Sequence, residues 1–399
     1  MQRDRATPAP AWSELEGIRL LRGVATALVR LGDSYGTESL SHPYPTEAQQ
    51  ALDTTVLACL LLKADPPESL PDLIEWAADR PVEAWPFTLP ADAIRFGSRL
   101  LDRDTRQPTQ LCYEWAVDGE RSAALSEQPF MTAAARRCRE EDYPEAYQAF
   151  RRLLIRRPVL TDRDLVTLPG APLGELEPLR DLLRDIYQPV PASYIHSGRG
   201  VCTACDRCGT LLHPTTEGGM WCERPICQKR DSVRAGREYR TDHDGGVHLL
   251  IRPLRQWVSA PGIQELQLAR RMAKAGADVE LWPDYGAYGM RVLLADGTAW
   301  AVEHKDWTTP ALLGRRAAPP GSGPPHDRCV WVVPAARLSE QPNFRATFER
   351  YRQGASPLLM SDRELVLAIR EASTSVPSGR RSDASGTRSP DDEPTGALF

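Results

Sequence analysis

Residues 290 to 307, MRVLLADGTAWAVEHKDW, constrain the fold more than any other part of the chain. Apolar residues recur on both sides of Asp296-Gly297, a pair that favours a tight turn between two antiparallel strands. The second strand ends in Glu303, His304 and Lys305. Residues two apart on a strand face the same side, so Glu303 and Lys305 are expected to reach one site while His304 faces away. A carboxylate and a lysine are among the residue types that metal-assisted hydrolysis uses, so the end of this strand is a candidate site.

A second metal-binding carboxylate is expected across the hairpin, but no acid stands there. With Asp296-Gly297 as a two-residue turn, Gly289 faces His304. The nearest upstream acid is Asp284, which a straight strand would hold about 16 Å away. Gly286 and Gly289 could let the chain double back, since glycine adopts conformations closed to other residues. Two interpretations stay open: Asp284 completes the metal site, or the site is degraded.

The segments around this hairpin predict an α/β domain. Before it, a helix is expected to start at Ser259-x-Pro261. In that helix Glu265 shares a face with Leu268, Ala269 and Met272, which directs its carboxylate toward the packing partner. The strand ADVELWP follows the helix, and CVWVVPAARL is a strand after the hairpin. A helix, a short strand (SPLLMS) and a last helix complete the order.

Five of the nine cysteines lie in the segment VCTACDRCGTLLHPTTEGGMWCERPIC. The spacing of four of them predicts a closed tetrahedral zinc site of structural type. These are Cys205, Cys208, Cys222 and Cys227. Cys202 and His213 are spare candidate ligands. Disulfides are disfavoured, because the remaining cysteines are scattered in a chain expected to be cytoplasmic.

The 399 residues are long enough for two or three domains. The predicted divisions are a helical interaction domain (1–190), a zinc ribbon (195–232), an α/β domain (246–372) and a disordered tail (373–399). No apolar stretch is long enough for a membrane span, and the N-terminus lacks a signal-peptide pattern, so a cytoplasmic protein without membrane contact is expected. The net charge of −5 argues against a chain-wide electrostatic grip on DNA but permits a local basic patch.

The order of helix, three strands, strand and helices, with Glu303-x-Lys305, resembles the restriction-endonuclease-like PD-(D/E)xK superfamily. The resemblance covers residues from about 255 to 370. It implies Glu303 and Asp284 as ligands of Mg²⁺ or Mn²⁺, Lys305 as the catalytic base and Glu265 as an auxiliary acid. The cysteine segment resembles a zinc ribbon, a platform for nucleic acid or protein.

The combination of these regions with the phrase DGTAWAVEHKDW resembles the nuclease component of bacterial PIWI-type (pPIWI-RE) three-gene defence islands. This resemblance implies DNA as substrate, a PIWI-like protein and a DinG-type helicase as partners, and a role against phage or plasmids. The sequence thus predicts a metal-dependent DNA endonuclease subunit. The alternatives are a degraded nuclease fold that acts as a DNA-binding or protein-binding adaptor, and a zinc-ribbon regulator with an unrelated C-terminal domain.

Overall fold

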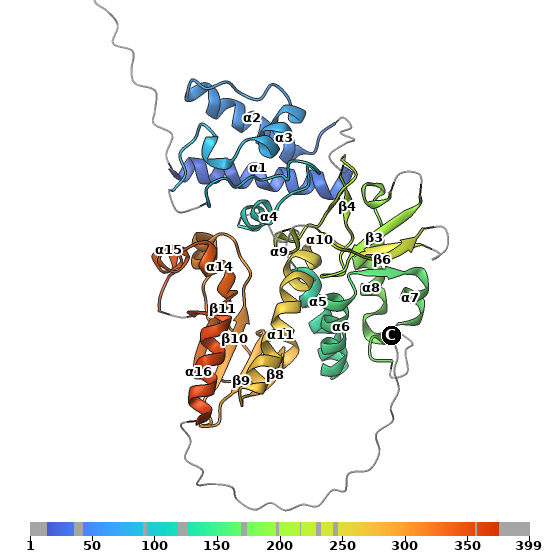
Figure 1. Cartoon of the computed structure of the whole chain (residues 1–399), viewed down its shortest axis with the longest axis vertical. Helices are drawn as coiled ribbons and strands as arrows, with labels where there is room; N and C mark the ends of the chain where they lie inside the picture. Colours follow the sequence, from blue (N-terminus) through green and yellow to red (C-terminus); the bar gives the residue numbers. More distant parts are fainter. Residues whose placement is uncertain are drawn as a thin grey trace, which may run out of the picture.

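The computed structural model shows helices and small sheets arranged around a five-stranded sheet (Figure 1). The residues that it describes are 14–35, 43–90, 94–118, 127–168, 174–196, 199–215, 217–228, 233–241, 246–355 and 357–374. The tail predicted for 373–399 lies outside them from residue 375 onward. Among the described helices, none combines the length and the apolar character that crossing a membrane requires.

The five-stranded sheet lies in the C-terminal region and has the order β12-β11-β10-β9-β8. Its strands are β8 (Asp278–Leu281), β9 (Met290–Leu293), β10 (Ala299–His304), β11 (Arg328–Val333) and β12 (Leu358–Ser361). The first three form an antiparallel meander, and β10, β11 and β12 run parallel to one another. The mixed α/β character predicted for this region is therefore observed.

Helices cover both faces of this sheet, which explains why β11 is apolar and buried from Cys329 to Val333. Val330 and Val332 pack with α11 (Ala260–Lys274) and α16 (Asp362–Thr374) on one face. Trp331 and Val333 belong to the core on the opposite face. Three helices contribute to that second side: α13 (Pro310–Arg315), α14 (Ala335–Glu340) and α15 (Phe344–Tyr351).

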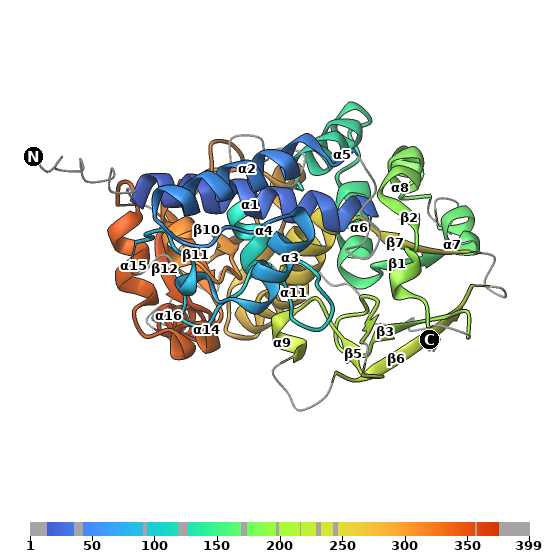
Figure 2. The same ribbon diagram turned by 90° about the horizontal axis from the view of Figure 1, so that it is seen from above.

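The N-terminal helices lie against the C-terminal region, and α1 runs across it in Figure 2. They are α1 (Glu14–Tyr35), α2 (Thr46–Leu61), α3 (Leu70–Asp79) and α4 (Gln110–Val117). Their buried side chains form one continuous core with Trp307, Leu312 and Trp331 of the C-terminal region. The helical character predicted for the N-terminal region is observed, but its core is shared rather than separate.

A second core lies within the range predicted as one helical domain. It is built by α5 (Gln128–Glu140), α6 (Pro144–Arg156) and α8 (Arg180–Ile186), next to the short α7 (Asp162–Thr167). Two strands of this unit, β1 (Val159–Thr161) and β2 (Tyr187–Pro189), flank β7 (Val247–Leu250) in a three-stranded sheet. The segment at 247–250, predicted to open the α/β domain, thus pairs with strands that precede the cysteines.

The cysteine-rich segment forms two small two-stranded sheets between β2 and β7. Its elements are β3 (Val201–Cys205), β4 (His213–Pro214), β5 (Met220–Trp221), α9 (Pro225–Gln228) and β6 (Ala235–Arg240). Because β2 and β7 are neighbours in the same sheet, this segment is an excursion from the second unit.

The helix that carries Glu265 begins earlier than predicted. The chain is already helical in α10 (Arg252–Leu254) and continues through a π-helical turn, Arg255–Ser259, into α11. Ser259 has helical φ and ψ of −66° and −47°, and its hydroxyl donates a hydrogen bond to the carbonyl of Leu154 at 2.5 Å. The predicted start at Ser259 thus matches the boundary of α11, but the helical chain extends upstream of it, and the Ser259 side chain contacts α6.

The turn of the hairpin is also longer than predicted. The amide of Leu294 donates to the carbonyl of Thr298 at 2.9 Å, and Gly297 has a φ of +88°. Three residues thus form the loop, which is the type I turn with a glycine bulge. The register pairs Met290 with Val302, so Gly289 stands opposite Glu303 and not His304. A slip of one residue reverses the face of every side chain, so this correction changes the interpretation of the site.

Candidate functional site

Glu303 and Lys305 point into the same site at the end of β10. The Lys305 ammonium forms an ion pair with Glu303 Oε2. Its nitrogen also lies 4.8 Å from the centre of the Trp331 ring on the neighbouring strand. The two side chains are about one quarter exposed, at 23% for Glu303 and 27% for Lys305, so both remain accessible. Their placement on one side agrees with the alternation of a strand.

Glu265 of α11 occupies the space that a side chain at position 289 would fill. A Cβ atom built on Gly289 would lie 2.9 Å from Glu265 Oε1 and 3.6 Å from the Cα of Glu303. The absence of a side chain at 289 therefore lets a helix carboxylate lie beside Glu303. The carboxylate that lies next to position 289 therefore comes from α11 and not from the chain leading into β9.

Glu265 is almost fully buried, with 6% of its surface exposed. Burial raises its pKa, and the charge of Glu303 acts in the same direction, whereas Arg151 and Lys305 act in the opposite one. Arg151 Nη2 lies 3.6 Å from Glu265 Oε2. The two carboxylates are thus close enough to influence each other, and two cations flank them.

The structure does not bring Asp284 to Glu303. The chain does fold back between β8 and β9, since Trp282, Asp284 and Tyr285 all have positive φ. This turn directs Asp284 outward, where its carboxylate pairs with Arg139 of α5 at 3.3 Å and remains 44% exposed. Among the described residues, those that line the cavities around Glu303 do not include Asp284.

Two cavities of about 310 Å³ each meet at Glu303, His304 and Lys305 and form one cleft. One cavity is lined by Glu265 and Gly289 together with Tyr147 and Arg151 of α6. The other is bordered by α4, by α13 and by Arg224 of the cysteine-rich segment. Trp307, which lies between β10 and α13, also lines it. The cleft is therefore walled by every major part of the described chain, although Glu265, Glu303 and Lys305 come from the C-terminal region.

His304 contributes to the floor of this cleft but not to its charge. Burial lowers the pKa of His304 to about 4, so its ring is neutral at pH 7. Its neighbour Asp306 is held by Arg337 at 2.7 Å, and this ion pair keeps the Asp306 carboxylate occupied. His304 is half-buried and lines both cavities beside Glu303 and Lys305, although the alternation of the strand predicted that it would face away from them.

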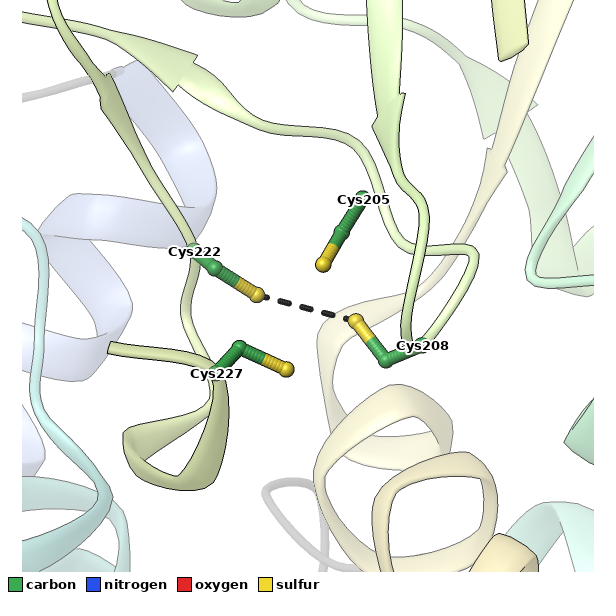
Figure 3. A group of neighbouring side chains, drawn as sticks. All are labelled: Cys205, Cys208, Cys222 and Cys227. Atoms are coloured by element: carbon green, nitrogen blue, oxygen red, sulfur yellow. Dashed lines mark hydrogen bonds between the residues drawn. The ribbon is translucent and has the colours of Figure 1, made fainter. Parts of the chain in front are cut away.

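Four cysteines of the ribbon form a compact cluster in which their sulfur atoms face one another (Figure 3). The sulfurs of Cys205, Cys208, Cys222 and Cys227 all lie within 4.8 Å of one another, and all four residues are buried. Cys208 Sγ and Cys222 Sγ are 3.6 Å apart. A tetrahedral zinc site with bonds of about 2.3 Å has its sulfurs roughly 3.8 Å apart, so this donor set fits a metal ion.

The two spare candidates lie outside this cluster. Burial raises the pKa of Cys202 to about 11, which keeps its thiol protonated at neutral pH. The ring of His213 lies 3.8 Å from that of Tyr194, centre to centre, and burial lowers its pKa to about 3. Both side chains pack in the interior and are not among the four residues that face one another.

Ion pairs anchor the ribbon to the helix of the candidate site. Glu223, next to Cys222, is fully buried and accepts hydrogen bonds from Arg255 at 2.9 and 3.0 Å. It also pairs with Arg252 at 3.2 Å, and Arg252 in turn donates to the carbonyl of Pro108 at 3.0 Å. The ribbon, the N-terminal helices and the start of the α11 helix therefore meet at one buried network. The sequence offered no spacing rule that could predict it.

Two of the regions that enclose this cleft match known protein families. Residues 20–161 match the family model described as pPIWI_RE three-gene island domain Y. Residues 262–376 match the model described as REase associating with pPIWI_RE. The chain is a restriction-endonuclease-like component of the pPIWI-RE type. Neither the curated proteins nor the solved structures give a match to it.

The candidate site residues of this pPIWI-RE component fall in both matched segments. Glu265, Glu303 and Lys305 all fall in the restriction-endonuclease-like match. Arg151, which pairs with Glu265, falls in the domain Y match. The four cysteines lie between the two matched segments. The cleft of this component is therefore formed across both matched regions.

Proposed function

We propose that the chain is a metal-dependent DNA endonuclease subunit that hydrolyses phosphodiester bonds in defence against phage or plasmids. One observation carries this proposal: Glu265, Glu303 and Lys305 converge in one cleft. This convergence disfavours a zinc-ribbon regulator with an unrelated C-terminal domain. A PIWI-like protein and a DinG-type helicase are the partners that we propose, because both matched models belong to pPIWI-RE islands.

The donor set of the cleft fits a divalent cation. Carboxylates are the protein ligands that Mg²⁺ and Mn²⁺ prefer, and Glu265 and Glu303 would hold the ion. Glu265 Oε1 lies beside Gly289, whereas Oε2 faces Arg151. When bound, the cation would lower the pKa of a water molecule and offset negative charge on the phosphate.

Lys305 would act on the attacking water. Its ammonium lies beside Glu303 and above the Trp331 ring, so its position is restrained from two sides. From there it can orient or deprotonate a water molecule and balance the negative charge that develops on the phosphate. We further propose zinc as the ion of the four-cysteine cluster, where it would be structural because no open position remains.

The test is cleavage of a plasmid in Mg²⁺ or Mn²⁺ by the wild type and by three variants. Lys305→Ala and Glu265→Gln are expected to lower the rate by about a hundredfold or more, because each removes a group that acts on the reacting atoms. Asp284→Asn is the matched control. It is expected to cleave normally, since Asp284 lies outside the cleft and pairs there with Arg139 at a distance of 3.3 Å.

The opposite pattern, with loss in Asp284→Asn and activity in Glu265→Gln, would place the second metal ligand at Asp284. A wild type that fails to cleave even with its partners would instead favour the non-catalytic adaptor. The observation behind that alternative is Gly289, which leaves β9 without an acid opposite Glu303.

A further inference from the structure

Besides Lys305, one further cation among the described residues lines the cavity that holds Glu265, and it comes from outside the restriction-endonuclease-like match. Arg151 lies on α6, in the segment that matches domain Y. It lines the same cavity as Glu265, Glu303 and Lys305. Its side chain is 17% exposed, so the guanidinium is enclosed but can be reached from the cavity.

The pairing of Arg151 with Glu265 is loose. At 3.6 Å the contact exceeds the length of an ordinary hydrogen bond. The same protein shows what a dedicated pair looks like, since Arg255 holds Glu223 with two bonds of 2.9 and 3.0 Å. Arg151 Nε is buried and has no hydrogen-bond partner among the described residues. Tyr147, one turn earlier on α6, also interacts with the guanidinium, so Arg151 is not committed to Glu265 alone.

Packing nevertheless fixes the guanidinium relative to the site. Its central carbon lies 4.9 Å from the centre of the Trp282 ring. The Trp282 amide donates to the carbonyl of Gly289 at 2.8 Å, which ties this indole to the strand opposite Glu303. Gly289, which leaves room for Glu265, is therefore hydrogen-bonded to Trp282, the residue on which Arg151 packs.

We propose that Arg151 binds a backbone phosphate of the nucleic acid beside Glu265 and Glu303, which makes the region matching domain Y part of the nuclease site. This inference rests on the proposed function, because it takes a nucleic-acid backbone as the ligand of the cleft. The planar guanidinium presents several N–H groups and matches the oxygens of a phosphate better than an ammonium does. Packing on the Trp282 ring holds the guanidinium in place before the phosphate binds.

The test measures binding of a fluorescently labelled DNA oligonucleotide to the full chain in Ca²⁺, together with the affinity of the DNA-free protein for Mn²⁺. Arg151→Ala is expected to weaken DNA binding about tenfold or more and to leave Mn²⁺ affinity within twofold. Arg151→Lys keeps the charge but loses the planar group, and we expect an intermediate affinity. Arg152→Ala is the matched control, because Arg152 is the next residue on α6 and is exposed.

Equal DNA affinity in Arg151→Ala and wild type would overturn the proposal. So would a parallel loss of Mn²⁺ affinity, because Arg151 would then only support Glu265. If Arg151→Ala fails to fold, Arg151→Lys decides alone, and wild-type DNA affinity in that variant would refute the role of the planar group. A wild type that binds DNA through Arg151 but does not cleave it would contradict the nuclease function and leave this inference intact.

Discussion

At the scale of single residues, a glycine decides which acid can enter the site. Gly289 stands opposite Glu303, and any side chain there would meet Glu265 Oε1 at 2.9 Å and the carbonyl of Val302 at 3.0 Å. The carbonyl belongs to the ladder of β10 and cannot move, so Glu265 would have to shift. Residue 289 thus shows how a position without a side chain can admit a second carboxylate from a neighbouring helix.

We therefore expect Gly289→Ala to slow DNA cleavage by roughly tenfold to a hundredfold, because small displacements of a reacting group are costly. The free energy of unfolding should fall by only about 1 kcal/mol, the usual result of mild overpacking. Cleavage rates and urea denaturation measure the two effects. Gly23→Ala is the control, since a methyl group at Gly23 meets no atom within 4 Å. Normal cleavage by Gly289→Ala would show that Glu265 does not act next to Glu303.

At the scale of elements, the cysteine-rich excursion is held by its sulfur cluster and by contacts with the α11 helix. The segment has short strands of two to six residues, which offer little core of their own. Small units of this kind depend on a metal for folding. Its buried Glu223 then joins Arg255 at the start of the helix that carries Glu265.

Replacement of one cluster cysteine is expected to release the metal. Cys222→Ser should reduce the bound zinc from one ion per chain to well below that, and it should lower the melting temperature, because metal binding contributes directly to folding. Cys202→Ala is the matched control, since Cys202 is buried in the same segment but lies outside the cluster. Metal analysis by mass spectrometry distinguishes them. Full metal content in Cys222→Ser would contradict the assignment of the ligands.

At the scale of the whole molecule, the N-terminal helices and the sheet share a buried polar contact as well as a core. Glu114 of α4 is fully buried, and burial raises its pKa. It accepts hydrogen bonds from the amides of Thr308 at 2.6 Å and Thr309 at 2.9 Å, just before α13. The two regions are therefore expected to unfold together.

Glu114→Ala tests this coupling. The substitution leaves the two threonine amides without their acceptor in the interior, and we expect it to lower the free energy of unfolding by about 3 kcal/mol. Glu75→Ala serves for comparison, because its pair with Arg106 is exposed and such pairs contribute little. Calorimetry should show one transition in the wild type. Separate transitions for the two regions, with no effect of Glu114→Ala, would refute a shared core.

The sequence by itself determined the elements of the C-terminal region and the residue types at their ends. Periodicity of two and of 3.6 placed the strands and helices, and local spacing brought together Glu303 with Lys305 and the four cysteines. These features depend on neighbours along the chain, which a sequence displays directly. The helical turns that precede α11 and the length of the hairpin loop were missed, because contacts with α6 and a glycine bulge decided them.

Only the tertiary structure decided which distant residues meet. The sequence left Asp284 and a degraded site as alternatives, whereas the fold packs α11 so that Glu265 lies beside Glu303 in the space next to Gly289. Arg151 is more than one hundred residues from either acid and has no motif around it. Its approach depends on how α6 packs against α11. Such packing sums many weak contacts over whole surfaces, so no short stretch of sequence specifies it.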